Sequence, residues 1–144
     1  MAAYGFGDDA LEWIFHDLPS FPSDLDTLHT EYSAKFIPWL ASLSRPPTAL
    51  LVEEDSRASV LVFLLNQAGW TVPDRMSVLA ICGSRRQPNS LDELSRILIP
   101  LGETFLRGLR MLHDLASRGT RTVRIEKMTA VYVPGQTCRA AEAK

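Results

Sequence analysis

The chain has 144 residues, of which 46% are hydrophobic, and its formal net charge at pH 7 is −2. This length supports a single domain with a substantial core. The small acidic charge argues against a protein built mainly to grip nucleic-acid phosphates. The two cysteines, Cys82 and Cys138, do not form a disulfide framework, which predicts a reduced, cytoplasmic setting. No apolar run approaches the roughly 20 residues that cross a bilayer, and no signal peptide is visible.

The N-terminal part of the sequence predicts helices. Apolar residues at helical spacing predict a helix over residues 9–18, followed by a turn-rich break. A second helix is predicted from about residue 25 or 27 to residue 43. Five large side chains form its apolar stripe: Tyr32, Phe36, Trp39, Leu40 and Leu43. Pro38 lies inside this stripe and should kink or reset the helix, because proline has no backbone N–H to donate.

Residues 47–82 contain the strongest pattern of the chain. A first strand, ALLV, lacks alternation, which is typical of a strand covered on both faces. Asp55 or Ser56 could cap the next helix, and Gly69 should end it. Four residues form that helix's apolar stripe: Leu61, Leu64, Leu65 and Ala68. A second strand over residues 78–81 completes the unit, whose natural solution is two parallel strands joined by a right-handed crossover.

The chain after Cys82 predicts a polar loop followed by a short turn and a brief strand. Residues 83–89 are polar and lie at the carboxyl end of the second strand. Ser90 and Glu93 have capping-box spacing, which indicates a helical turn over residues 91–94. Residues 97–99 should then be extended.

A long helix is predicted over residues 101–117, with Pro100 in its first turn and Gly119 at its end. Its stripe is formed by Leu101, Phe105, Leu109, Leu112 and Ala116. Alternation from residue 122 predicts two short strands or one bent strand, and residues 134–144 should be loose. The whole pattern predicts an α/β fold with a mostly parallel sheet flanked by helices.

Candidate ligand groups gather where the predicted strands end, because open α/β sheets bind ligands at the carboxyl ends of their strands. The acidic run of residues 53–55 could bind hydroxyls or a cation, or could form a helix cap and a solvated turn. Arg85 and Arg86 could hold an anion, or belong to an exposed loop. Trp70 is better read as a core residue than as a sugar-stacking platform. Cys82 is better read as a small buried hydrophobe than as a nucleophile, because no histidine follows it closely.

No metal site is predicted, because the three histidines lie far apart and none has a cysteine nearby. No resident cofactor is expected either.

Several spaced motifs resemble one known family. These are PTALLV at residues 47–52, AG at 68–69, VP at 72–73 and SV at 77–78. Together they resemble the effector-binding domain of lac-repressor/galactose-repressor (LacI/GalR) transcription regulators. Residues 97–105, around Pro100, resemble the family's hinge and following helix, and the motif YVPGQT near the end resembles its closing strand. The resemblance covers roughly residues 9–137 and is sharpest over residues 47–81.

The resemblance implies a fold, a function and a domain division. The family's fold has two lobes like those of periplasmic binding proteins, with a small effector, often a sugar or nucleoside, bound between them. A separate N-terminal helix-turn-helix reads DNA. The chain would then be the C-terminal part of such a regulator. Residues 1–137 would form a partial effector-binding and dimerisation domain, and residues 138–144 a flexible tail. It would be a cytoplasmic homodimer without enzymatic activity, contacting DNA only through a domain absent here.

The candidate effector contacts are Asp55, Glu54 and Cys82, at positions that the resemblance indicates, together with Arg85. Of the family's usual contacts, only Asp55 is retained. Glu54 replaces an asparagine, Ala80 and Cys82 replace a glycine and an acidic residue, and Ile99 replaces a glutamine. An unmatched buried polar group costs about 1–3 kcal/mol, so these changes favour a less polar effector. They also leave open an oligomerisation module with a degenerate pocket. A small-molecule enzyme using Asp55 and Cys82 is a third alternative.

The long helix of residues 101–117 carries an apolar stripe that needs a cover. In the family, this helix and the following strand pack on the other lobe. Leaving large side chains in water forgoes about 1.5–3 kcal/mol each. We therefore expect the stripe to be buried by a second copy, by domain exchange, or by folding back on its own lobe.

Overall fold

The structure is a computed structural model that describes residues 25–82, 93–119 and 124–140. The helices are α1 (Leu25–Glu31), the π-helix η2 (Tyr32–Phe36), α2 (Ile37–Ser42), α3 (Asp55–Gln67) and α4 (Leu101–Arg118). The strands are β1 (Ala49–Val52), β2 (Ser77–Cys82), β3 (Ser95–Leu98) and β4 (Val131–Val133). The predicted helix of residues 9–18 and the loop of residues 83–89 lie outside the described residues, as do the first two residues of the turn predicted over residues 91–94.

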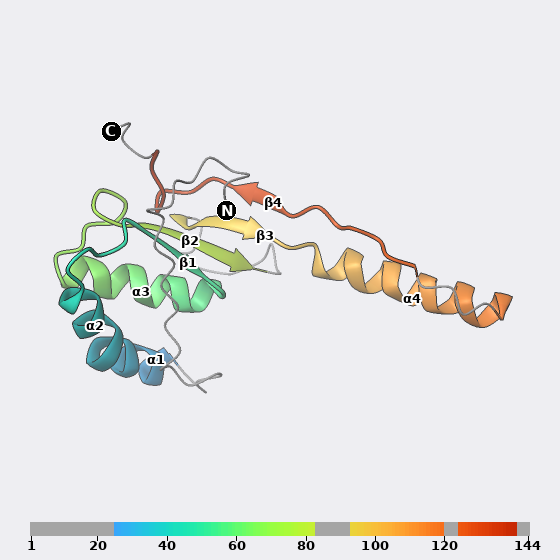
Figure 1. The fold of residues 1–144 in the computed structure, drawn as a ribbon, viewed down its shortest axis with the longest axis horizontal. Coiled ribbons are helices and arrows are strands. Elements are labelled where there is room, and N and C mark those ends of the chain that lie inside the picture. Colours follow the sequence, from blue (N-terminus) through green and yellow to red (C-terminus); the bar gives the residue numbers. More distant parts are fainter. Residues whose placement is uncertain (1–24, 83–92, 120–123, 141–144) are drawn as a thin grey trace.

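The four strands form one sheet in the order β1-β2-β3-β4. Strands β1, β2 and β3 are parallel, whereas β4 runs antiparallel to β3. Helix α3 crosses from β1 to β2, so the predicted βαβ unit is confirmed (Figure 1). The register places Val52, Ala80, Arg96 and Val133 in one row across the sheet. The predicted fold class, α/β with a mostly parallel sheet, is therefore confirmed.

The second predicted helix is continuous but changes its winding in the turn before Pro38. Helices α1 and α2 are joined by η2, and the N–H of Ile37 donates to the carbonyl of Tyr32, five residues earlier. Pro38 follows in the first turn of α2, where a missing N–H costs least. The wider π turn thus lets the helix resume past a residue that cannot donate, as the sequence predicted.

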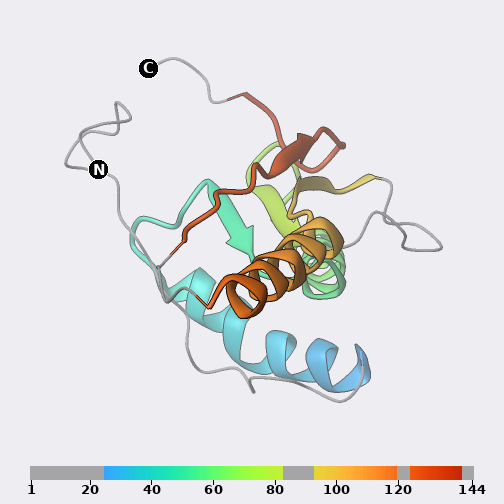
Figure 2. The same cartoon turned by 90° about the vertical axis from the view of Figure 1, so that its right-hand side faces the viewer.

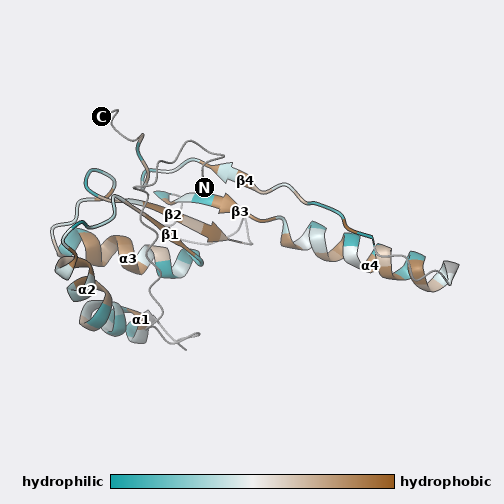
Figure 3. Ribbon diagram, in the orientation of Figure 1, coloured by the Kyte–Doolittle hydropathy of each residue, from teal (hydrophilic) through white to brown (hydrophobic). Residues whose placement is uncertain are grey.

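The core lies between the sheet and the helices of one face, α1–α2 and α3 (Figure 3). Its largest fully buried hydrophobic side chains are Leu40 on α2, Leu65 on α3, Met76 just before β2, and Val78 on β2. The opposite face of β1 is open among the described residues, because Leu51 is 63% exposed. The prediction that β1 is covered on both faces is therefore wrong for this part of the chain. Among the described residues, no helix is both long and apolar enough to cross a membrane.

The segment after β4 is fixed against the sheet. The hydroxyl of Thr137 accepts from the N–H of Ser95 at 2.9 Å and donates to the carbonyl of Val78 at 2.7 Å. The N–H of Gly135 donates to the Ser95 hydroxyl at 3.2 Å, and that of Arg139 donates to the Ser77 hydroxyl at 3.3 Å. The prediction of a loose end from residue 134 is therefore wrong for residues 134–139. A short polar segment can be ordered by such long-range bonds, which its composition does not reveal.

Helix α4 extends away from the rest of the fold, and the chain returns alongside it to β4 (Figures 1 and 2). Gly119 ends α4 in the left-handed conformation with φ 63°, as predicted. The apolar stripe of α4 stays in water, with Leu101 55%, Phe105 67% and Leu112 64% exposed. Folding back on its own lobe, one of the three expected covers, is therefore contradicted. Of the described part of the predicted strand region after residue 122, only Val131–Val133 is a strand.

Candidate functional site

The candidate site lies at the edge of the sheet where the parallel strands end. Val52 pairs with Ala80, so Asp55, three residues beyond Val52, and Cys82, two residues beyond Ala80, both lie toward the same edge. Leu98, the last residue of β3, pairs with Cys82 there. The crossover topology therefore brings the two segments that carry the predicted contacts to one rim of the molecule, as the sequence predicted.

Asp55 is the first residue of α3 and is only 4% exposed. Its Oδ1 accepts from the N–H of Ser56 at 2.9 Å. The cap position is held by Glu54, which is extended and makes no side-chain cap bond. The prediction that Asp55 or Ser56 is the cap residue is therefore wrong, because Glu54 occupies that position. The Asp55 carboxylate nevertheless accepts a hydrogen bond from an N–H of the first turn. The positive end of α3 favours a carboxylate at this place.

A charged network joins this rim to the N-terminal helices. The Glu54 Oε2 lies 3.2 Å from the Arg57 Nε. The Arg57 side chain also hydrogen-bonds the Tyr32 hydroxyl, and Tyr32 is 2% exposed. Burial raises the pKa of Tyr32, while the nearby Arg57 guanidinium opposes this rise. Our sequence reasoning missed this network. The spacing of Glu54 and Arg57, i and i+3 across the start of a helix, was the available signal.

Cys82 closes β2 and is buried, with 6% of its surface exposed. Its carbonyl accepts from the N–H of Ile99 at 2.8 Å, which ties the ends of β2 and β3 together. Neither Cys82 nor Cys138 forms a disulfide. Burial agrees with the reading of Cys82 as a small buried hydrophobe. Arg85, the fourth predicted contact, lies outside the described residues.

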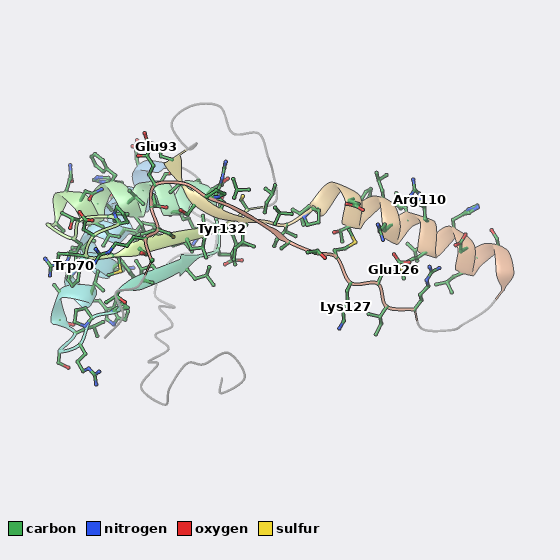
Figure 4. The ribbon with its side chains drawn as sticks, turned by 90° about the horizontal axis from the view of Figure 1, so that it is seen from above. Trp70, Glu93, Arg110, Glu126, Lys127 and Tyr132 are labelled. Atoms are coloured by element: carbon green, nitrogen blue, oxygen red, sulfur yellow. The ribbon has the colours of Figure 1, made fainter. Side chains whose placement is uncertain are left out.

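Trp70 lies at the opposite end of the sheet from this rim (Figure 4). It follows the C-terminus of α3, and α3 runs antiparallel to the strands it connects. Trp70 is half-buried against the core, and the Arg75 guanidinium lies 4.6 Å from its ring centroid. The core reading of Trp70 is therefore confirmed, and its position excludes stacking on a ligand at the carboxyl edge.

Arg96 on β3 is a second residue that our reasoning missed. It is 9% exposed, and its Nε has no hydrogen-bond partner. It lies beside Ala80, two residue pairs inside the row formed by Cys82 and Leu98. A buried guanidinium donor without a partner can bind a hydroxyl or a carboxylate. A charged residue in a short strand ordinarily indicates exposure, which is why the sequence pattern did not reveal it.

A cavity of about 430 Å³ lies away from the rim, between α4 and residues 124–126. Its walls are mostly charged, and opposite charges pair across it: Arg107 with Glu126 at 3.6 Å, and Arg124 with Asp114 at 4.0 Å. These ion pairs form a network that holds residues 124–126 against α4. The distance of the cavity from Asp55 and Cys82 separates it from the candidate site.

The comparisons with known proteins agree with this geometry. The sequence profile of the periplasmic binding protein-like domain matches residues 14–138. The crystal structure of a transcriptional regulator assigned to LacI, from Bacillus cereus subsp. cytotoxis NVH 391-98, is similar with a TM-score of 0.62 and 18% identity. That match covers 87% of this chain and 44% of the regulator.

An uncharacterised protein from Actinobacillus succinogenes is similar with a TM-score of 0.60 and 16% identity, covering 81% of this chain and 40% of that protein. A search of curated proteins found no match. The chain thus spans less than half the length of these two solved structures. Their similarity shows which fold this chain has. Because the family profile covers most of the sequence, the chain belongs to the periplasmic-binding-protein-like domain family, with the LacI-like fold that its motifs indicated.

Proposed function

We propose that the chain is an effector-binding lobe of a LacI-type transcription regulator. It would bind a small sugar-like or nucleoside-like molecule at the carboxyl edge of the sheet and change its arrangement with a partner lobe in response. The observation that best supports this is the meeting of Asp55 and Cys82 at one rim of a family fold. In this proposal the chain is cytoplasmic, performs no catalysis and reaches DNA only through a separate domain.

The rim offers a specific division of roles. Asp55, fixed by the Ser56 N–H and the first turn of α3, would accept hydrogen bonds from ligand hydroxyls. Glu54 is half exposed, with 53% of its side chain in water, and would contact the outer part of the ligand. Cys82 would form an apolar floor, and Arg85 stays a predicted contact outside the described residues. The replaced family contacts favour a ligand less polar than a free hexose.

A thermal-shift screen of sugars, nucleosides and sugar phosphates tests this proposal. We expect at least one class to raise the melting temperature, because a ligand that binds only the folded state stabilises it. The shift should disappear in Asp55→Ala and persist in Asp74→Ala, a matched acidic residue that lies beyond the other end of α3. A shift that survives Asp55→Ala would place the ligand elsewhere and contradict the proposed site.

The second candidate function is an oligomerisation module with a degenerate pocket. The exposed stripe of α4 favours it, because Phe105 and Leu112 are 67% and 64% exposed in the isolated chain. Only Asp55 of the family's usual contacts is retained, which also supports this candidate. If no ligand of the screen raises the melting temperature and the chain associates tightly with itself, the oligomerisation module is favoured over effector binding.

A further inference from the structure

We propose that the ligand of the carboxyl edge carries a carboxylate group, which the Arg96 guanidinium binds. The inference rests on the proposed function and names the chemical class of its ligand, a sugar acid rather than a neutral sugar. It starts from a charged side chain that lies inside the fold. Arg96 is 9% exposed, and its buried Nε has no hydrogen-bond partner among the described residues.

The positive charge of Arg96 is not neutralised within the part of the chain that the structure describes. The acidic side chains that pair with arginines there serve Arg57, Arg107 and Arg124 instead. A guanidinium does not lose its proton in proteins, and a buried charge without a partner destabilises the fold. A ligand that brings a negative charge would remove this cost, so binding would complete an arrangement that the chain leaves unfinished.

Arg96 shares one face of the sheet with the other site residues. Paired residues of neighbouring strands point to the same side and successive residues to opposite sides, so Arg96 shares a side with its partner Ala80 and with Cys82. This side is packed against the core, since Ala80 and Cys82 are buried whereas Ile81 between them is only partly buried. Asp55 begins α3, the helix that packs on this side.

The Arg96 side chain is long enough to reach the carboxyl edge. Arg96 lies two residues before Leu98, the last residue of β3, which is about 7 Å along a strand. An extended arginine side chain covers a similar distance. The residue beside it on β2, Ala80, carries only a methyl group, which leaves space for a long side chain along the strand toward Cys82.

The charges of the rim favour a carboxylate over a phosphate. Arginine nitrogens form a planar fork that matches the two oxygens of a carboxylate, and the free Nε is one arm of this fork. One guanidinium balances one negative charge. The carboxylates of Asp55 and Glu54, at the start of α3, would repel the second charge of a phosphate monoester. A neutral hydroxyl would accept from the Nε but leave the charge of Arg96 unbalanced.

A sugar acid also suits the contacts that the site retains. Among the family's usual contacts only Asp55 is kept, so few groups remain to match a full set of hydroxyls. A pair between a guanidinium and a carboxylate is about twice as strong as a neutral hydrogen bond and would replace part of the lost affinity. Strands β1 and β3 are two strand spacings apart, about 10 Å. A six-carbon acid with a hydrogen bond at each end could therefore join Asp55 to Arg96.

A comparison of matched acids and neutral sugars tests the inference on the 144-residue chain. D-glucuronate and D-galacturonate are compared with D-glucose and D-galactose at constant ionic strength, by thermal shift and by titration calorimetry. We expect an acid to raise the melting temperature more than its neutral counterpart. Its affinity should fall at least about 10-fold in Arg96→Met and should not be restored by Arg96→Lys, which keeps the charge but loses the fork.

Arg75→Met is the matched control for these variants. The Arg75 guanidinium lies against the Trp70 ring, at the opposite end of the sheet. Its replacement should change the affinity for the acid by less than about twofold, because a distant charge is screened by salt. Equal losses of affinity in Arg75→Met and Arg96→Met would show a general effect of positive charge and would overturn the inference.

The stability of the free chain separates ligand binding from a structural role. Arg96→Met removes the unbalanced charge and keeps a long side chain, so the melting temperature without ligand should stay the same or rise. A clear fall would show that the fold itself uses the charge, and it would overturn the inference. Circular dichroism of each variant confirms that the secondary structure is retained.

The outcomes distinguish this inference from the proposed function. Neutral sugars that bind through Asp55 as tightly as the acids would overturn the carboxylate and leave the proposed function standing. An acid whose binding survives Arg96→Met would do the same, as would glucose 6-phosphate binding more tightly than either acid. If neither the acids nor any member of the first screen binds, both the inference and the proposed function fail.

Discussion

Replacing Thr137 by valine should destabilise the fold far more than an ordinary surface change. The hydroxyl is buried in a residue that is 6% exposed, and it bridges the N–H of Ser95 and the carbonyl of Val78. Valine keeps the shape of the side chain but leaves the Ser95 N–H buried without a partner. The Val78 carbonyl keeps one donor, the Cys138 thiol, and the Val78 N–H still donates to the Thr137 carbonyl. One lost bond plus one orphaned donor amounts to about 2–3 kcal/mol.

Urea unfolding followed by circular dichroism measures this cost. Thr104→Val is the matched control, because the Thr104 hydroxyl bonds the Pro100 carbonyl at 2.9 Å on the exposed side of α4. Its loss should cost less than about 0.5 kcal/mol. Thr137→Ser keeps the hydroxyl and should recover most of the stability. If Thr137→Val costs no more than Thr104→Val, the closing segment does not hold the sheet together and our account of this edge is refuted.

Three further predictions follow from the packing and the charges. Gly135→Ala places a Cβ against the backbone of Glu93 and Leu94, and it should lower the free energy of unfolding in urea by at least about 2 kcal/mol. The control is Gly102→Ala, whose Cβ enters open space on α4. It should be neutral or raise the free energy of unfolding by up to about 1 kcal/mol. Leu65→Ala, at a side chain with 0% exposure, should cost about 2–5 kcal/mol. Equal costs for the two glycine variants, or a negligible cost at Leu65, would contradict the packing. Burial raises the pKa of Tyr32 above its ordinary value of 10.0, so its contribution to stability is complete below pH 10 and declines as the pH rises past it. Unfolding of Tyr32→Phe between about pH 9 and 11 should lack this decline, and an identical pH profile for both proteins would contradict the assignment.

The sequence predicted the βαβ unit well because each local signal agreed with the next. An apolar strand, the stripe around Leu65, the left-handed Gly69 and the second strand leave one common topology. The same topology brought Asp55 and Cys82 to one edge. Pro38 predicted the change in helical winding for an equally local reason, the missing N–H.

Features that depend on distant contacts could not be predicted in this way. The polar segment ending at Thr137 looked loose, since its partners on β2 and β3 lie more than 40 residues away in the sequence. Leu51 looked buried, because an apolar strand does not indicate that one of its faces is left open by the rest of the fold. The Arg96 side chain was missed because its buried surroundings are formed only by the fold.

The central claim, that the carboxyl edge of the sheet is the ligand site, is tested most directly by mapping amide shifts. A ¹H–¹⁵N correlation spectrum of the chain would be titrated with the sugar, nucleoside or sugar phosphate that gives the largest thermal shift. We predict that the largest changes fall on Glu54, Asp55 and Cys82. Changes confined to the α4 cavity around Glu126, or to Trp70 at the opposite end of the sheet, would contradict the claim.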